Sequence, residues 1–163
     1  MNTDKRKEFE SLHKEYQPMV YNLCKGFVKG DKDLASDLSR EVFIIVWNSL
    51  AKFKEQSSLK TWIYRICVNT CLKYFRNKKE DFSLIDEIHS NNAEDDQENI
   101  KQQNETKLYT AISTLKETDR LIIMMVLEEL KYEEIAKVMG ISTTNLRVKI
   151  HRIKQQLKKQ LER

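Results

Sequence analysis

The sequence of 163 residues has few residues that turn or interrupt a chain, with 3 glycines and 1 proline. Sheets need many turn residues and alternating strands, so this scarcity argues against a β-rich fold and favours helices. No apolar run approaches the length of a membrane-spanning helix, and the polar N-terminus lacks the apolar core of a signal peptide. We therefore expect a cytoplasmic protein of one or two small helical domains, without direct membrane insertion.

Cysteine is also scarce, and the odd number of 3 argues against a disulfide framework. Cys67 and Cys71 lie four residues apart on a predicted helix, a spacing that would allow both to bind one metal ion. No histidine pair nearby completes a set of four ligands, so we interpret both as small core residues. The sequence therefore predicts neither a metal nor a cofactor.

Catalytic patterns are missing as well. The three histidines, His13, His89 and His151, are scattered, and the chain has neither a glycine-rich phosphate loop nor a Ser/His/Asp pattern. We therefore expect a protein that is not an enzyme and that has no small-molecule substrate.

Charge is abundant and unevenly distributed along the chain, whose net charge is +4. Residues 60–79 carry six Lys/Arg and no acid, and residues 80–98 carry eight Asp/Glu and no Lys/Arg. From residue 147 onward the sequence has seven Lys/Arg and one acidic residue, Glu162. The order basic, acidic, basic suggests two nucleic-acid surfaces joined by an anionic tether.

The chain divides into two helical blocks and a linker. The blocks span residues 5–79 and 105–162, and the stretch 80–104 lacks apolar periodicity, which is typical of a flexible acidic linker. We predict an all-α fold of two small helical domains. Apolar spacing predicts five helices ahead of a helix-turn-helix, over residues 5–29, 33–50, 58–77, 105–115 and 118–130.

Residues 132–152 have the sequence form of a helix-turn-helix. Ala136 is small enough for a close helix crossing, Gly140 suits a left-handed helix end, and Ser142 can cap the next helix. Any helical hairpin with a glycine turn would share these features. The basic surface of the second helix favours DNA binding, in which that helix lies in a major groove.

One face of the predicted helix over 58–77 combines cations, an amide and an indole. Cations neutralise phosphates, an amide can contact a base edge, and an indole can stack on an exposed base. The alternative is a solvated basic face beside a half-buried tryptophan. We favour nucleic acid, and leave direct base stacking open. This face holds Trp62, Arg65, Asn69, Lys73 and Arg76, and the predicted core side holds Ile63, Ile66, Cys67, Thr70, Cys71 and Tyr74.

The predicted helix over 33–50 has a narrow polar stripe with Ile44 at its centre. An isoleucine among charges, beside a large aromatic residue, is typical of a protein-binding patch. A three-helix domain that buries most of this helix explains the pattern equally well. The stripe holds Asp37, Arg40, Glu41 and Asn48. The core side holds Leu34, Leu38, Val42, Ile45 and Val46, and Phe43, Trp47 and Leu50 extend the apolar surface.

These segments resemble the sigma subunits of bacterial RNA polymerase, in particular the small extracytoplasmic-function (ECF) group. Asp37–Trp47 is similar to the family's Asp-Leu-x-Gln-Glu-Val-Phe-x-x-x-Trp helix of region two. Phe53–Ile66, with Asn69 and Tyr74–Arg76, is similar to its promoter-melting segment. The C-terminal block is similar to region four, with Tyr132–Ala136, Gly140–Ser142 and His151–Arg152 in register.

The resemblance implies a role for each segment. The helix over 33–50 would bind the β′ clamp of core RNA polymerase through Asp37, Arg40, Glu41, Ile44, Trp47 and Asn48. The loop with Lys52, Lys54, Ser57 and Ser58 would hold a flipped base of the minus-ten element. The melted strand would contact Trp62, Arg65, Asn69, Lys73 and Arg76.

The second helix of the helix-turn-helix would bind the minus-thirty-five element as duplex. Arg147 is the best candidate for contacting a guanine, and Val148 for contacting a thymine methyl. The family's usual Val-Lys-Ser-Arg is Leu146–Lys149 here, and its usual Leu-Pro is Leu115-Lys116. The full set of predicted contacts is Thr143, Thr144, Arg147, Val148, Lys149, His151 and Arg152.

The resemblance implies an ECF-type sigma factor that binds core polymerase, through the β′ clamp and the β flap, and starts transcription at promoters. It also implies an anti-sigma partner, and a linker that follows the polymerase RNA channel. Two alternatives belong to other classes. A stand-alone helix-turn-helix regulator would bind duplex DNA without polymerase, and a helical adaptor would bind protein only.

Overall fold

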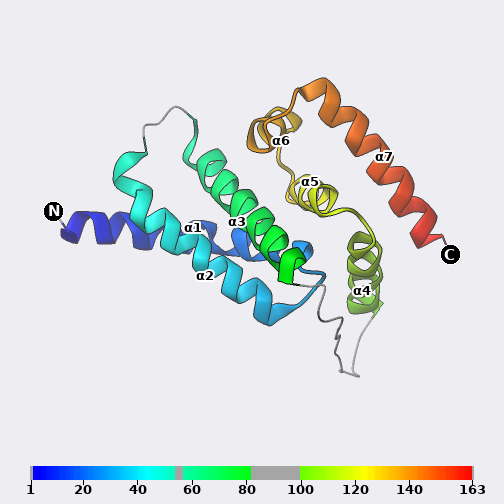
Figure 1. The fold of residues 1–163 in the computed structure, drawn as a ribbon, viewed down its shortest axis with the longest axis horizontal. Coiled ribbons are helices and arrows are strands. Elements are labelled where there is room, and N and C mark those ends of the chain that lie inside the picture. Colours follow the sequence, from blue (N-terminus) through cyan, green and yellow to red (C-terminus); the bar gives the residue numbers. More distant parts are fainter. Residues whose placement is uncertain (1, 54–56, 82–99, 163) are drawn as a thin grey trace.

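The computed structural model describes residues 2–53, 57–81 and 100–162. Within these ranges the chain is helical and contains no strand, so the prediction of an all-α fold is confirmed (Figure 1). The elements are α1 (Asn2–Phe27), α2 (Lys32–Ser49), the 3₁₀ turn η1 (Leu50–Lys52), α3 (Leu59–Asp81), α4 (Ile100–Ser113), α5 (Glu117–Leu127), α6 (Tyr132–Met139) and α7 (Thr143–Leu161).

The helices on either side of the predicted linker are longer than expected. Helix α3 ends at Asp81 rather than at residue 77, and α4 begins at Ile100 rather than at residue 105. Lysine, glutamate and glutamine are good helix formers, which allows α3 to continue beyond its last apolar residue and α4 to include the polar stretch after Ile100. The rest of the predicted linker, residues 82–99, lies outside the described residues.

Two of the N-terminal helices begin at side-chain caps. The Asp31 carboxylate accepts a hydrogen bond from the backbone N–H of Leu34 at 3.1 Å and caps α2. The Ser58 hydroxyl, just before α3, accepts from the N–H of Thr61 at 3.1 Å. Such caps satisfy backbone donors that the first helical turn leaves unpaired.

Helices α1, α2 and α3 form the N-terminal half, in which α2 packs along α1 (Figure 1). The prediction for one residue of α2 was wrong. Ile45 was expected in the core but is 36% exposed, whereas Phe43, which was expected to extend the apolar surface of the helix, is 4% exposed. The Phe43 ring lies against the rings of Phe9 and His13 of α1, so α1 covers α2 on the side of Phe43.

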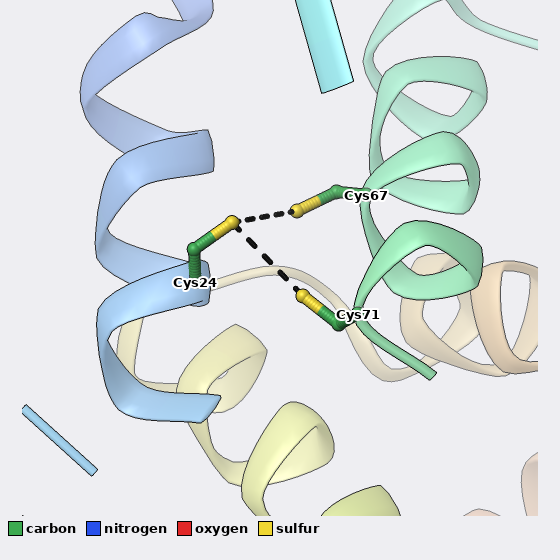
Figure 2. Close-up of side chains that lie close together, drawn as sticks. All are labelled: Cys24, Cys67 and Cys71. Atoms are coloured by element: carbon green, nitrogen blue, oxygen red, sulfur yellow. Dashed lines mark hydrogen bonds between the residues drawn. The ribbon is translucent and has the colours of Figure 1, made fainter. Parts of the chain in front are cut away.

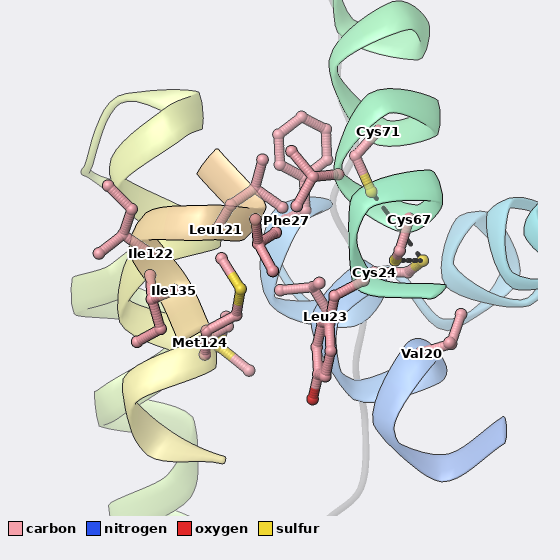
Figure 3. Packing of buried hydrophobic residues seen from close by; sticks show 14 of the residues in the cluster. Val20, Leu23, Cys24, Phe27, Cys67, Cys71, Leu121, Ile122, Met124 and Ile135 are labelled. Carbon is pink, nitrogen blue, oxygen red and sulfur yellow. Dashed lines mark hydrogen bonds between the residues drawn. The ribbon is translucent and has the colours of Figure 1, made fainter. Parts of the chain in front are cut away.

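Helices α4 to α7 form the C-terminal half, which packs against the N-terminal half. Helix α5 lies against α1 and α3, and α6 lies against α3. Helix α3 is therefore buried on two sides, because Tyr64 and Val68, outside its predicted core side, are buried too. Figure 3 shows that apolar residues of α1, α5 and α6 belong to one continuous core.

Polar contacts also join the halves. The Arg120 guanidinium of α5 donates from Nε to the Phe27 carbonyl at 2.9 Å, at the end of α1. Arg65 Nε donates to the Lys137 carbonyl of α6 at 3.2 Å. The Asn22 amide donates to the Glu128 carboxylate at 3.4 Å. Burial of the apolar core and these bonds together stabilise the docked arrangement.

In the described part of the chain, no helix combines the length and apolar character that crossing a membrane requires.

Candidate nucleic-acid and protein interfaces

The helix-turn-helix forms as the sequence predicts. Helix α6 ends at Gly140, whose φ of 73° is left-handed, and the Gly140 N–H donates to the Ala136 carbonyl at 2.8 Å. The Ser142 hydroxyl accepts from the Asn145 N–H at 3.1 Å and starts α7. Glycine tolerates the left-handed conformation, so the chain reverses over three residues without strain.

One side of α7 is buried and the other is exposed. Leu146, Ile150, Ile153 and Leu157 are at most 7% exposed and hold α7 on the C-terminal half. The predicted duplex-contacting residues lie on the other side, and Thr143 alone among them is partly buried. Val148 is 45% exposed although it is apolar, so it is available for contact with a base methyl. The exposed members are Thr144, Arg147, Val148, Lys149, His151 and Arg152.

The predicted stripe on α3 is exposed for most of its length. Asn69, Lys73 and Arg76 are exposed. Arg65 is exposed as well, but its Nε is bonded to the α6 carbonyl of Lys137. The structure therefore brings one cation of the predicted strand-binding surface into a contact between the halves, which spacing along the chain did not indicate.

The tryptophan of this stripe packs against the loop that precedes α3. The Trp62 and Phe53 rings have centroids 4.8 Å apart and planes inclined at 36°. Both rings are partly buried, so Trp62 presents only part of its surface to solvent. Among the other predicted loop residues, Lys52 and Ser58 are exposed and Ser57 is partly buried, while Lys54 lies outside the described residues.

The outer face of α2 combines charges with exposed apolar surface. Asp37 and Arg40 form an ion pair at 3.1 Å, and both side chains are about two-thirds exposed, so the pair adds little to stability. Ile44 is 55% exposed, and Glu41 and Asn48 are exposed beside it. An apolar side chain ringed by charges suits a partner protein better than solvent.

Trp47 marks the end of this face. Its indole is partly buried, with the Phe9 ring edge-on at 5.2 Å and the Lys5 ammonium 4.4 Å from the ring centroid. Because Lys5 and Phe9 belong to α1, the first turns of α1 shape the surface around Trp47. Both residues lie outside the helix whose residue spacing predicted this patch.

Arg120 is a buried cation that the sequence did not single out. It is 6% exposed, and burial lowers the pKa of its guanidinium, against the opposing effect of Glu117. Besides the Phe27 carbonyl, it donates to the Leu115 carbonyl at 2.7 Å. A lone arginine in the apolar run of 120–127 is the only local sign of this role, and arginines beside apolar runs are common.

Sequence comparison matches both halves to one family. The family described as Sigma-70 region 2 matches residues 12–80, and the family described as Sigma-70, region 4 matches residues 105–157. The RNA polymerase sigma factor YlaC of Bacillus subtilis is 27% identical over 96% of this chain and 93% of its own length. The ECF RNA polymerase sigma-E factor of Escherichia coli is 30% identical over 92% of this chain and 84% of its own length.

Solved structures share the fold across nearly the whole chain. The sigma factor RpoE of Bartonella quintana, in complex with the anti-sigma factor NepR, matches with a TM-score of 0.76 and 19% identity, over 96% of this chain and 98% of its own. CnrH in complex with the cytosolic domain of CnrY matches with a TM-score of 0.72 and 17% identity, over 96% and 89% of the two chains.

Proposed function

The chain belongs to the sigma-70 family, in its ECF group, and we propose that its surfaces on α2, α3 and α7 bind polymerase, melted DNA and duplex DNA, respectively. The observation that carries this proposal is the placement of three chemically different exposed faces on α2, α3 and α7. A sigma factor directs the polymerase and needs no catalytic group of its own, so we propose that the protein is not an enzyme and acts in the cytoplasm.

Helix α2 is the proposed contact with core polymerase. Ile44 is 55% exposed at the centre of this face and would supply the apolar contact. Asp37, Arg40 and Glu41 would surround it with charge, which orients a partner and speeds its association. The Trp47 indole, held by Lys5 and Phe9 of α1, would form the rim.

Helix α3 and the loop before it are the proposed contact with the opened minus-ten element. Asn69, Lys73 and Arg76 lie exposed along one face, and the Trp62 and Phe53 rings lie at its N-terminal end. A base that leaves the duplex loses a few kcal/mol of stacking, and aromatic rings and cations offset that loss. Lys52, Lys54, Ser57 and Ser58 would line the pocket for the flipped base.

Helix α7 is the proposed reader of the minus-thirty-five element. Arg147 has the fork geometry for a guanine edge, and Val148 suits a thymine methyl. Lys149, His151 and Arg152 would lie toward the phosphates, together with Thr143 and Thr144 near the start of the helix. Phosphate contacts position the helix, and contacts with base edges select the sequence.

The docked arrangement is incompatible with simultaneous binding of both promoter elements. Two turns of DNA separate such elements by roughly 70 Å, whereas α6 packs directly on α3. Arg65 would also have to release the Lys137 carbonyl before it contacts DNA. We propose that core polymerase separates the halves, and that an anti-sigma factor holds the protein away from polymerase.

Transcription with purified components tests the whole proposal. Adding the protein to core RNA polymerase should produce defined transcript starts, whereas the protein alone should bind duplex DNA weakly. Tight binding to a palindromic duplex without polymerase would favour the stand-alone regulator instead. The absence of both a stable complex with core polymerase and any transcript would exclude the sigma-factor role.

The two tryptophans separate promoter opening from polymerase binding. Trp62→Ala should reduce promoter opening about 5- to 150-fold, since stacking on a base contributes about 1–3 kcal/mol, and should leave core binding unchanged. Trp47→Ala is the matched control, because it removes a partly buried indole of the same half and should weaken core binding. Equal loss of both functions in Trp62→Ala would indicate a folding role for this residue.

A further inference from the structure

All three cysteines of the chain meet in the core of the N-terminal half. Cys24 belongs to α1, and Cys67 and Cys71 lie one turn apart on α3 (Figure 2). Cys24 Sγ lies 3.7 Å from Cys67 Sγ and 4.0 Å from Cys71 Sγ. All three sulfurs lie within 4.8 Å of one another, and each side chain is 0% exposed.

These separations match the ligand spacing of a thiolate metal site. Sulfurs bound about 2.3 Å from one zinc ion in tetrahedral directions lie about 3.8 Å apart. Two of the three pairs here are within 0.2 Å of that spacing, with no change of backbone (3.7 and 4.0 Å). The sequence indicated only the pair on α3, and the third sulfur comes from α1 through the tertiary fold.

A buried cation near the cluster can balance the charge of a metal–thiolate site. The Cys71 thiol donates to Cys24 Sγ, and Cys67 Sγ shares a second hydrogen bond with the same sulfur. The hydrogen bond with Cys24, and burial, raise the pKa of Cys71, and the Arg120 guanidinium, itself 6% exposed, opposes that rise. Within the described residues no ion pair links Arg120 to a carboxylate. Three thiolates and one divalent cation carry a net charge of −1, which this guanidinium neutralises.

We propose that Cys24, Cys67 and Cys71 form a three-thiolate site for a soft divalent cation, zinc or cadmium, with Arg120 as its counter-charge. Thiolates select such ions over magnesium or calcium, which prefer oxygen ligands. On binding, the Cys24, Cys67 and Cys71 thiols each lose a proton to solvent. The ion forms three metal–sulfur bonds without any change of oxidation state. It joins α1 to α3, next to the Arg120 contact of α5.

Titration of the reduced, metal-free full-length chain tests the site. Cadmium should bind at one equivalent per chain, with sulfur-to-cadmium ultraviolet absorption, release of three protons and a higher unfolding temperature. A parallel titration with zinc, and competition between the two ions, identifies the preferred ion. Cys24→Ala should weaken binding at least about 100-fold, because loss of even an outer-sphere partner costs 10- to 100-fold.

Val20→Ala is the matched control. Val20 is 0% exposed and lies one turn before Cys24 on α1, so this variant weakens the same core but keeps all three sulfurs. It should bind the ion as the unaltered chain does. Undiminished cadmium binding by Cys24→Ala, or less than about one tenth of an equivalent bound by the unaltered chain, would overturn the proposal.

If the cysteine variants do not fold, X-ray absorption of the metal-loaded, unaltered protein identifies the atoms that coordinate the ion. Three sulfur neighbours support the site, and coordination by oxygen or nitrogen alone overturns it. Transcription by the metal-free protein is a separate measurement. The metal site and the proposed sigma-factor role therefore fail or succeed independently.

Discussion

Tyr64 shows how a single buried polar atom shapes stability. Its hydroxyl is buried without a hydrogen-bond partner among the described residues, and its side chain is 0% exposed. Burial, followed by the charge of Glu128, raises the pKa of Tyr64 well above its usual value. The ring packs between α3 and the C-terminal half, and its burial stabilises the fold. Burial of the hydroxyl oxygen without a hydrogen bond costs part of that free energy.

Tyr64→Phe should therefore stabilise the protein by about 1 kcal/mol, because it removes an unsatisfied polar atom and keeps the ring. A raised folded-state pKa of an acid contributes stability that is complete below the unfolded pKa near 10 and is lost as pH rises above it. The difference in the free energy of unfolding between the phenylalanine variant and the unaltered protein should therefore grow above pH 10. Urea denaturation at pH 7 and pH 10.5 measures both effects, and a less stable variant would reveal a partner for the hydroxyl.

Lys116 is a second residue with a specific prediction. It is the N-cap residue of α5, and its φ is −65°, the angle that a proline ring imposes. Lys116→Pro should raise the free energy of unfolding by about 0.5–1 kcal/mol, because it restricts the unfolded chain. Lys116→Ala is the control and should leave stability nearly unchanged. A lower free energy of unfolding for the proline variant, measured by chemical denaturation, would contradict the prediction.

At the scale of elements, the crossing of α1 and α5 depends on one glycine. A Cβ at Gly26 would lie 2.3 Å from Met124 Sδ and 2.4 Å from its Cγ. Glycine inside a helix costs about 1 kcal/mol relative to alanine. Here it allows the methionine of α5 to approach the backbone of α1, which a side chain would prevent.

Gly26→Ala should therefore destabilise the protein by about 1–2 kcal/mol despite its better helix propensity, because the added methyl displaces Met124. In a Met124→Ala background the same change should be neutral or stabilising. A double-mutant cycle by chemical denaturation should show a coupling above about 1 kcal/mol. Additive effects would mean that Met124 moves aside without cost.

Helix α3 illustrates what a helical wheel can and cannot predict. Spacing separated its exposed cations from a buried side that includes Ile63 and Cys67, and the structure confirms that division. The wheel did not indicate that Tyr64 and Val68 are buried as well. Burial on a second side requires a partner helix, and α5 and α6 are distant in the sequence.

At the scale of the whole molecule, the Arg120 contact contributes to docking of the two halves. Its guanidinium satisfies the last carbonyl of α1, at Phe27, and the Leu115 carbonyl before α5. Removal of the guanidinium would leave both carbonyls without this donor in a largely apolar environment. Substitution of Arg120 therefore tests directly whether this contact keeps the two halves together.

Arg120→Met should cost about 2 kcal/mol of stability and increase the fraction of molecules with separated halves. Arg120→Lys, which keeps the charge but not the two-pronged donor, should be intermediate. Small-angle scattering would detect separation as a larger radius of gyration. An unchanged radius and unchanged stability in Arg120→Met would show that apolar packing alone holds the halves together.

The sequence by itself determined the helical class, the helix-turn-helix with its Gly140 turn and Ser142 cap, and the exposed side of α7. Each of these depends on backbone preferences and periodicity within a few turns, which neighbouring residues encode. Only the tertiary structure decided that the halves dock, that Arg65 contacts α6, and that Cys24 joins the two cysteines of α3. These contacts link residues 43 to 106 positions apart or lie between separate helices, and local spacing carries no information about such distances.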